Sequence, residues 1–303
     1  MSSTALPSMV MRRLGPVRSI RTETQKMMRF LRNPARRIRH QMGLRDVVRR
    51  PELSGLLDEK KGYGYIPRDA LPRLDEAVQF CRDVLERRRD KPELWPVPAR
   101  KRDAFPIPIL QPTEYSEAPA IFDLVLSDQV LQIVSEYFGE VPVLQRINIW
   151  WTPQNTEIRG SQFYHRDTMS WAERQAKFFI NITDVGPDDG PFTFLPADIS
   201  DRIVRKLGYP PDRVTDDFVF QHASPDDQVL VVGSPGTACV LDSSRCLHYG
   251  SRCKGGERLV LMFNFRPYLS PDGSHKVHTV SKEFARELGS HPVRRLIYPV
   301  ATR

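Results

Sequence analysis

Short stretches in which apolar and polar residues alternate follow one another through the second half of this 303-residue chain. A period of two is typical of β-strands, because successive side chains of a strand point to opposite faces of its sheet. The pattern predicts strands over residues 143–151, 177–182, 229–232, 237–241 and 258–265. Many short strands separated by glycine and proline turns favour a mainly β fold with flanking helices, a double-stranded β-helix of the cupin-like jelly-roll type.

Two of these strands carry polar residues on one face. One face of the strand over residues 143–151 consists of Leu144, Arg146, Asn148 and Trp150. Arg146 and Asn148 are therefore candidates to face a polar cavity, and the alternative is a sheet edge that faces solvent. One face of the strand over residues 177–182 consists of Lys177, Phe179 and Asn181, and the other face is wholly apolar. We expect the apolar face to pack against other elements and the mixed face to line the cavity.

Helical spacing precedes the strands. Asp69 suits an N-cap, and the helix that follows should end before Pro92. Its apolar stripe consists of Leu71, Leu74, Val78, Cys81 and Leu85. A second helix is predicted over residues 118–138, since Gly139 suits the C-terminal end of a helix. A short helix over residues 200–209 precedes an irregular insert, residues 210–227, which we expect to form a lid beside the barrel.

Positive charge is concentrated at the N-terminus. The chain has a formal net charge of +8, but residues 1–50 alone hold 13 Lys and Arg against two acidic residues, a net of +11, so the remainder carries −3. This pattern predicts a solvated basic arm that contacts an anionic surface, either membrane phosphates, nucleic acid or an acidic partner. The first 22 residues contain no acidic residue, which also suits an organellar transit peptide. We expect residues 51–303 to form a single domain, with a helical front (51–140), the jelly-roll core (about 141–268) and a C-terminal tail (269–303).

The apolar runs and the cysteine spacing indicate the cellular compartment and the kind of metal site to expect. No run of about 18 apolar residues is present, so no membrane-spanning helix is expected. The four cysteines have no CxxC spacing, which makes a cysteine metal site improbable and is typical of a reduced, cytoplasmic protein.

The segment Ser161–Asp167 contains the first candidate metal ligands. In an extended chain, His165 and Asp167 share one face and Arg166 lies on the other. An imidazole beside a carboxylate supplies two of the three ligands of a 2-His-1-carboxylate site, which leaves open positions on Fe(II). A histidine far downstream should supply the third.

His248 is the best candidate for this third ligand because a short apolar strand leads into it. Ten residues later Arg258 opens the next strand, and the turn between them predicts a hairpin that brings a guanidinium near the metal, as a fork suited to a carboxylate. His222 lies in the predicted lid, and His275 and His278 follow the last strand, so these are weaker candidates. The alternative for the whole set is a hairpin with a buried structural histidine and a surface arginine.

With this ordered set of residues the chain resembles the phytanoyl-CoA dioxygenase family of Fe(II)- and 2-oxoglutarate-dependent oxygenases. The resemblance covers about residues 60–268 and includes an opening segment, Gly62–Pro67, and a central hairpin around residues 178–196. The chain departs from the family where many members have Gly-Ser-His, since it has Ala197–Ser200 there. It departs again two residues past the distal histidine, where several members carry serine and this chain has Gly250 followed by Ser251.

The resemblance implies that His165, Asp167 and His248 bind Fe(II) and that 2-oxoglutarate is the co-substrate. It implies that Arg258 binds the distal carboxylate of 2-oxoglutarate, helped by Asn148 or Lys177. The implied activity is hydroxylation of an unactivated C–H bond in a small molecule or biosynthetic intermediate, with dioxygen. Related halogenases lack the carboxylate ligand, so Asp167 favours hydroxylation or another oxidation. The alternatives are a metal-binding jelly roll without turnover, one that works without 2-oxoglutarate, and an adaptor whose function lies in the basic arm.

Overall fold

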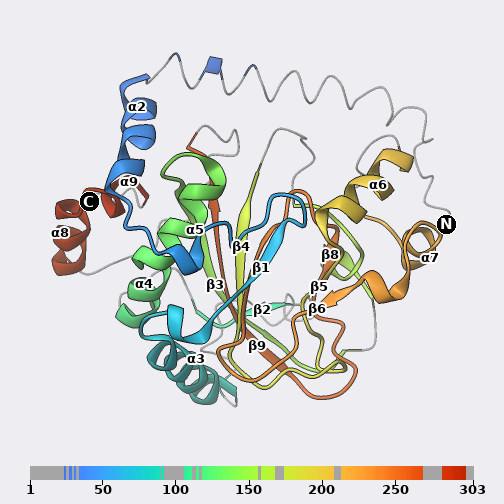
Figure 1. The fold of residues 1–303 in the computed structure, drawn as a ribbon. Coiled ribbons are helices and arrows are strands. Elements are labelled where there is room, and N and C mark those ends of the chain that lie inside the picture. The colour runs from blue at the N-terminus through green and yellow to red at the C-terminus, as the bar shows by residue number, and fades with distance from the viewer. Residues whose placement is uncertain are drawn as a thin grey trace.

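A computed structural model of the chain describes residues 24, 27, 28, 31, 34–89, 91, 106–110, 114, 115, 118–155, 158–167, 174–207, 213–268 and 282–297. Two antiparallel sheets form its centre, and helices lie against the outside of the larger sheet and beside the smaller one (Figure 1).

The larger sheet has six strands in the order β1-β7-β4-β9-β3-β2, and all its pairings are antiparallel. The strands are β1 (Tyr63–Ile66), β2 (Ile107–Pro108), β3 (Val143–Thr152), β4 (Ala176–Asn181), β7 (Ala238–Asp242) and β9 (Arg258–Arg266). The three longest strands that the alternating pattern predicts, β3, β4 and β9, are neighbours in the sheet. Since side chains alternate along each of them, the sheet has one face of uninterrupted apolar residues and one mixed face.

The smaller sheet has the order β6-β5-β8, with β5 (Thr193–Phe194), β6 (Val229–Leu230) and β8 (His248–Tyr249). Single bridges join Tyr164 to Val214 and His165 to His248, so the extended segment around His165 runs beside β8. An apolar cluster contains residues of both sheets: Phe179, Phe192, Phe194, Ala197, Val231, Cys239, Leu241, Cys246, Val260 and Met262. The mixed face of the larger sheet therefore looks toward the smaller sheet.

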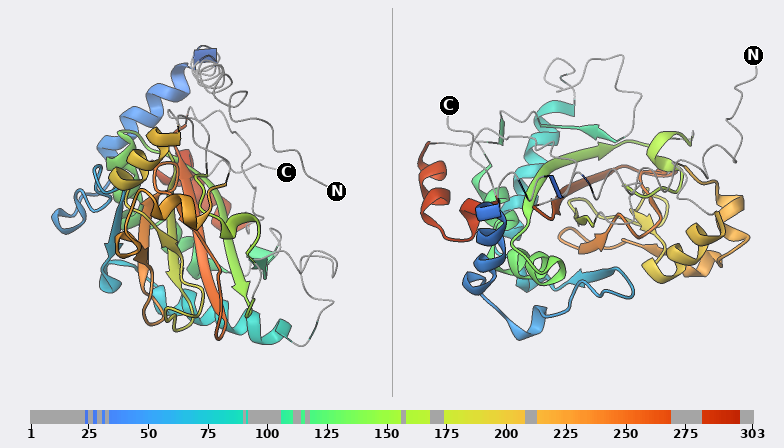
Figure 2. Two further views of the ribbon diagram at one scale, coloured as in Figure 1. Left: turned by 90° about the vertical axis from the view of Figure 1, so that its right-hand side faces the viewer. Right: turned by 90° about the horizontal axis from the view of Figure 1, so that it is seen from above.

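The apolar face of the larger sheet packs against helices. These are α3 (Leu74–Arg89), α4 (Pro119–Val125), α5 (Asp128–Phe138), α8 (Lys282–Ser290) and α9 (Arg294–Ile297). Two further helices, α6 (Ala197–Leu207) and α7 (Asp216–Phe220), lie on the side of the smaller sheet, as the views in Figure 2 show. Short 3-10 helices span Gly43–Asp46, Pro51–Leu53, Arg68–Ala70, Gly160–Gln162 and Pro225–Asp227. The prediction that Phe178, Ile180 and Ile182 pack on the apolar side is confirmed, because all three belong to the large core cluster.

One predicted face was wrong in part. A β-bulge lies between Leu144 and Arg146 on β3, so Gln145 is an extra residue opposite β9. Leu144 belongs to the helix-side core with Ile147 and Ile149, whereas the sequence pattern placed it beside Arg146. A bulge changes the phase of the alternation, which residue types alone do not reveal.

The helix predicted over residues 118–138 is two helices. Ser127 has extended backbone angles and its Oγ accepts a hydrogen bond from Val130 N at 3.4 Å, so it caps α5 and ends the helix before it. Gly139 ends α5 in the left-handed conformation (φ 65°), as predicted. The first predicted helix begins later than expected, at Leu74, because the segment Arg68–Ala70 forms a 3-10 turn.

The second half of the basic arm contacts the body of the protein, although its charge predicts a solvated segment. Within α2 (Pro34–Met42), the buried His40 stacks on Tyr268 with ring centroids 4.4 Å apart. His40 Nδ1 donates a hydrogen bond to Val141 O at 2.6 Å, and Arg37 forms an ion pair with Glu140. Residues 34–50 therefore pack on the domain that follows them.

Among the described residues, no helix is long and apolar enough to cross a membrane. All four cysteines are buried and unpaired, in agreement with the expectation of reduced thiols.

Candidate metal centre

His165, Asp167 and His248 come together in the structure. One candidate ligand atom from each of the three side chains lies within 4.8 Å of the others. Backbone pairing creates this arrangement: His165 N donates to His248 O, and His248 N donates to His165 O, both at 3.0 Å. Asp167 N donates to Ser243 O at 3.0 Å, which holds the carboxylate beside the two rings. The predicted grouping of a His-x-Asp segment with a distal histidine is thus present.

The two imidazole rings are oriented by backbone carbonyls. His165 Nδ1 lies 2.8 Å from Phe163 O, and His248 Nδ1 lies 2.9 Å from Cys246 O. A neutral ring whose Nδ1 carries the proton presents the lone pair of Nε2, and this is the usual way in which a protein orients a metal-binding histidine. His248 Nε2 lies 3.7 Å from Asp167 Oδ2. His248 therefore directs its free nitrogen toward this carboxylate, and His165 offers a ligand atom within 4.8 Å of both groups.

The surroundings keep His165 and Asp167 in the protonation state that a metal ion requires. Burial, together with the proximity of His248, lowers the pKa of His165 to about 3. Burial by itself raises the pKa of Asp167, but Lys177 and His248 outweigh it and hold that pKa well below its usual range. Lys177 Nζ lies 2.5 Å from Asp167 Oδ2. A neutral histidine and an ionised carboxylate are the forms that coordinate metal ions.

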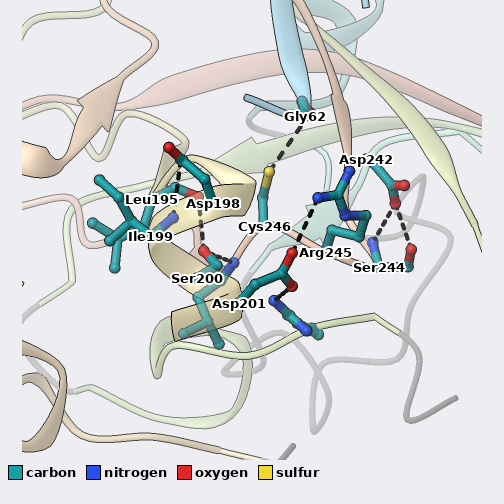
Figure 3. A network of polar contacts seen from close by, with 12 residues as sticks. Gly62, Leu195, Asp198, Ile199, Ser200, Asp201, Asp242, Ser244, Arg245 and Cys246 are labelled. Atoms are coloured by element: carbon teal, nitrogen blue, oxygen red, sulfur yellow. Dashed lines mark hydrogen bonds and ion pairs between the residues drawn. The ribbon is translucent and has the colours of Figure 1, made fainter. Parts of the chain in front are cut away.

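An ion-pair network fixes this segment from its other face. Arg166 Nη2 donates to Asp201 Oδ1 at 2.7 Å, and Arg245 Nη2 donates to Asp201 Oδ2 at 3.0 Å. Figure 3 shows Asp201 on α6 next to Arg245, with Ser200 beside it. Ser200 Oγ accepts a hydrogen bond from Leu247 N at 2.8 Å. Helix α6 therefore contacts both the segment that contains His165 and the segment that contains His248. Arg166 points to this helix and away from His165 and Asp167, as the alternation predicts.

Arg258 lies in the same cavity and is almost completely buried, with 2% of its surface exposed. Its Nη2 donates to Ser251 Oγ at 3.0 Å, and Thr152 Oγ1 donates to the same oxygen at 3.0 Å. Among the described residues, Nε and Nη1 of Arg258 have no hydrogen-bond partner. A buried guanidinium with two unsatisfied nitrogens is costly unless a ligand supplies acceptors, so this site fits a carboxylate.

The sequence predicts no role for Ser251, yet its side chain accepts a hydrogen bond from Arg258. It adopts φ 69°, one of two non-glycine residues with positive φ among those described. Such a conformation is costly for a residue with a side chain and is kept where the surroundings require it. Thr152 carried no signal in the sequence, because its contact with Ser251 joins positions 99 residues apart.

The candidate ligands and Arg258 line one cavity of about 290 Å³. The other lining residues are Pro106, Gln145, Arg146, Trp150, Ser161, Gln175, Lys177, Phe179, Phe192, Gly250, Ser251, Met262, Asn264 and Arg266. Arg146 therefore faces a polar cavity, as the first of the two alternatives predicted. Asn264 lies on the same face of β9 as Arg258 and lines the same cavity, together with Gln145, Gln175 and Arg266, which the sequence pattern does not assign to it.

The remaining predicted residues occupy different places. Asn148 is buried on β3 opposite Met262, and its Nδ2 has no hydrogen-bond partner among the described residues, but it is not a lining residue. Lys177 contacts Asp167 and pairs across the sheet with Asn264, six residues along β9 from Arg258. His222 is exposed beside α7, as expected for the predicted lid. His275 and His278 lie outside the described residues.

No protein-family model matches the sequence, and no curated protein matches it. Solved structures do match the fold. The crystal structure of EctD from S. alaskensis in its apoform aligns with a TM-score of 0.51 at 14% identity, over 73% of this chain and 78% of EctD. EctD with 2-oxoglutarate and 5-hydroxyectoine aligns with a TM-score of 0.50 at 13% identity, over 73% of this chain and 77% of that one. AviO1 from Streptomyces viridochromogenes Tue57 has a TM-score of 0.49 at 16% identity, over 74% and 99% of the two chains. This chain therefore shares the fold of EctD.

Proposed function

We propose that this protein is an Fe(II)- and 2-oxoglutarate-dependent oxygenase that hydroxylates an unactivated C–H bond of a small molecule. The observation that carries the proposal is the position of Arg258, a buried guanidinium with two unsatisfied nitrogens in the cavity of His165, Asp167 and His248. A metal site alone leaves this arginine unexplained, whereas a dicarboxylate that chelates the metal supplies its missing acceptors. The shared fold of EctD, a protein solved with 2-oxoglutarate, supports the same assignment.

In this proposal the two sheets are the halves of a double-stranded β-helix, and residues 51–303 form one domain onto which residues 34–50 pack. His165, Asp167 and His248 hold Fe(II), with the histidines bound through Nε2. Three protein ligands leave coordination positions open for 2-oxoglutarate and dioxygen. When bound, the metal and 2-oxoglutarate supply the oxidising chemistry that adds one oxygen atom of dioxygen to the substrate.

The residues of the chain contribute binding, orientation and exclusion of water. Arg258 and Ser251 bind the distal carboxylate of 2-oxoglutarate. Lys177 forms an ion pair with Asp167 and so stabilises its ionised form. Phe179 and Phe192 stack with ring centroids 3.7 Å apart, and Phe192 lies 5.4 Å from the ring of His248, so apolar rings cover this side of the site. Asn148 is the lesser candidate for a co-substrate contact, because it lies outside the cavity lining.

Anaerobic titration tests this function without a known substrate. The protein loaded with Fe(II) should bind 2-oxoglutarate and, once oxygen is admitted, release succinate in amounts that depend on iron. The control is Asp167→Ala, which should do neither. Iron binding without 2-oxoglutarate binding would support the alternative of a metal-binding jelly roll that works without this co-substrate. Incubation with a metabolite extract and 2-oxoglutarate, followed by a search for products that gain one oxygen atom, would then identify the substrate.

We also infer a second function, for the basic arm, as a contact with anionic membranes. In the described part of the arm the large apolar side chains of Met27, Met28, Leu31, Ile38 and Met42 are 48–68% exposed. Ile38 and Met42 lie four positions apart on α2, so they share one face of this helix. The net charge of +11 over residues 1–50 complements an anionic surface. Sedimentation with phosphatidylserine-containing vesicles should retain the protein, and neutral vesicles should not. Equal retention by polynucleotides would instead indicate attraction by charge alone.

A further inference from the structure

The cavity contains a second cationic site at the opposite end of β9 from Arg258. Arg146 lines this end, and it faces Asn264 across the β3–β9 pair. Asn264 in turn faces Lys177 across the β9–β4 pair. Arg266, at the end of β9, also lines the cavity. Three cationic side chains from three neighbouring strands are thus collected on the side where β9 ends.

The polar side chains at this end are held in place by one another. Asn264 Nδ2 donates to Gln145 Oε1 at 2.6 Å, and Arg266 Nη2 donates to Gln175 Oε1 at 2.8 Å. Gln145, Gln175 and Asn264 are all buried, with 4% or less of their surfaces exposed. Buried amides and guanidinium groups are costly to maintain in a sheet interior where apolar side chains would pack equally well. Asn264 Oδ1 is buried without a hydrogen-bond partner among the described residues, so a polar ligand at this position would satisfy it.

The charge of the cavity shows what kind of ligand fits. Among the residues that the structure describes, its lining includes four cationic residues, Arg146, Lys177, Arg258 and Arg266, and one carboxylate, Asp167. Lys177 is paired with Asp167, and in the proposed function 2-oxoglutarate neutralises Arg258. Arg146 forms no ion pair among the described residues, and its Nε is buried without a hydrogen-bond partner there. Arg146 is only partly buried, but its Nε is shielded from water, so an anion at this end of the cavity would supply the acceptor that this nitrogen lacks.

The anion at this end is not the same molecule as the one at Arg258. Six residues of β9 separate Arg258 from Asn264, which is about 20 Å along a strand. The five-carbon skeleton of 2-oxoglutarate is too short to reach both sites while it chelates a metal between them. The second site is therefore left for the other organic reactant.

We propose that Arg146, with Asn264 and Arg266 beside it, binds an acidic group of the primary substrate, a carboxylate or a phosphate. The substrate is then an organic anion whose charged end lies at Arg146 and whose reacting carbon lies near the metal ligands. This inference rests on the proposed function, because 2-oxoglutarate at Arg258 is what leaves this end of the cavity to the substrate.

Calorimetry on the anaerobic protein loaded with Fe(II) and 2-oxoglutarate tests the inference. The probes are acetate, methyl phosphate and, as a neutral match to acetate, acetamide. Wild-type protein should bind at least one of the two anions and bind acetamide more weakly than acetate. Arg146→Gln should weaken anion binding about tenfold or more, since a hydrogen bond to a charged group is lost. Arg146→Lys, which keeps the charge without the fork, should fall between them.

Two controls separate the outcomes. Arg205→Gln removes the same charge from the exposed side of α6 and should leave anion binding unchanged. The affinity for 2-oxoglutarate should be the same in Arg146→Gln and wild type. The inference is overturned if no anion binds, if acetamide binds as well as acetate, or if Arg146→Gln binds anions as wild type does. A loss of 2-oxoglutarate binding in Arg146→Gln would also overturn it, by assigning Arg146 to the co-substrate. Failure of wild-type protein to bind 2-oxoglutarate at all would instead refute the proposed function.

Discussion

Ser251 Oγ accepts a hydrogen bond from Arg258 Nη2 at 3.0 Å. Ser251 makes this contact in a backbone conformation with φ 69°, which is strained for a residue with a side chain. If Arg258 binds 2-oxoglutarate, both residues should affect its affinity. Arg258→Lys and Arg258→Ala should weaken 2-oxoglutarate binding in that order, by roughly 1.5–3 kcal/mol overall. Anaerobic titration measures the effect, and iron content should change little in either variant.

Two substitutions of Ser251 separate its hydrogen bond from its backbone conformation. Ser251→Ala keeps the strained conformation and loses the hydrogen bond to Arg258, whereas Ser251→Gly loses the bond and relieves the strain. Both should weaken 2-oxoglutarate binding by about 1 kcal/mol, but only the glycine variant should recover thermal stability. Unchanged affinity in both variants would mean that Ser251 does not position Arg258.

Asp167→Ala should abolish Fe(II) binding while the fold persists. Loss of one of three protein ligands should exceed the roughly 10- to 100-fold effect expected of an outer contact. Because Asp167→Ala leaves the ammonium of Lys177 without its carboxylate, the double variant Asp167→Ala with Lys177→Met is the better test of folding. Lys177→Met alone is the matched control and should retain iron. If Asp167→Ala bound iron as tightly as the wild-type protein does, Asp167 would not be a metal ligand.

His40 should make stability depend on pH. Burial, opposed in part by the Val141 hydrogen bond, lowers its pKa to about 4, against an ordinary value of 6.5. The unfolded chain therefore binds a proton below pH 6.5 that the folded protein does not bind until about pH 4. Stability due to this residue is complete above pH 6.5 and falls as the pH drops toward 4, by up to about 3 kcal/mol.

Urea unfolding at a series of pH values checks this expectation. His40→Asn can keep a donor to Val141 O but does not titrate, so the difference in unfolding free energy between wild type and variant should change between pH 7 and pH 5. If the difference in unfolding free energy did not change with pH, His40 would have the same pKa in the folded and the unfolded protein.

The arm should tolerate one truncation and not another. Removal of residues 1–33 ends before α2 and should leave the melting temperature unchanged. Removal of residues 1–50 also takes away His40, the buried Val47 and the hydrogen bond from Arg50 N to Gln132 Oε1 at 2.7 Å. That loss should lower the melting temperature by about 5–10 °C. Equal melting temperatures for the two truncated proteins would mean that α2 does not stabilise the domain.

Vesicle binding of folded variants tests the arm separately. Ile38→Ser with Met42→Ser removes two exposed apolar residues of α2 and should weaken binding to anionic vesicles while the fold is retained. High salt should weaken it further by screening the arginines. Binding that responds to salt but not to these substitutions would restrict the contact to charge.

The sequence predicted the features that depend on local pattern. Alternation predicted the strands and assigned Phe178 to the core, and the ordered set of His165, Asp167, His248 and Arg258 predicted one cavity. The sequence did not predict features that depend on contacts between segments far apart in the chain. The stacking of His40 on Tyr268 joins positions more than 200 residues apart, and charge alone predicted the opposite for this helix. The cap at Ser127 was also missed, because serine is tolerated within helices and only the structure shows the break.

The β-bulge at Gln145 links the length of the chain to the chemistry of the cavity. On one side of the bulge Val143 and Leu144 are buried apolar residues. On the other side Gln145 and Arg146 line the cavity. An insertion or deletion of one residue at this point should change which side chains line the cavity and leave Leu144 in the core. If the proposed function is correct, this bulge in β3 is the place to begin a redesign for a different substrate, because a change of length there alters the cavity and not the core.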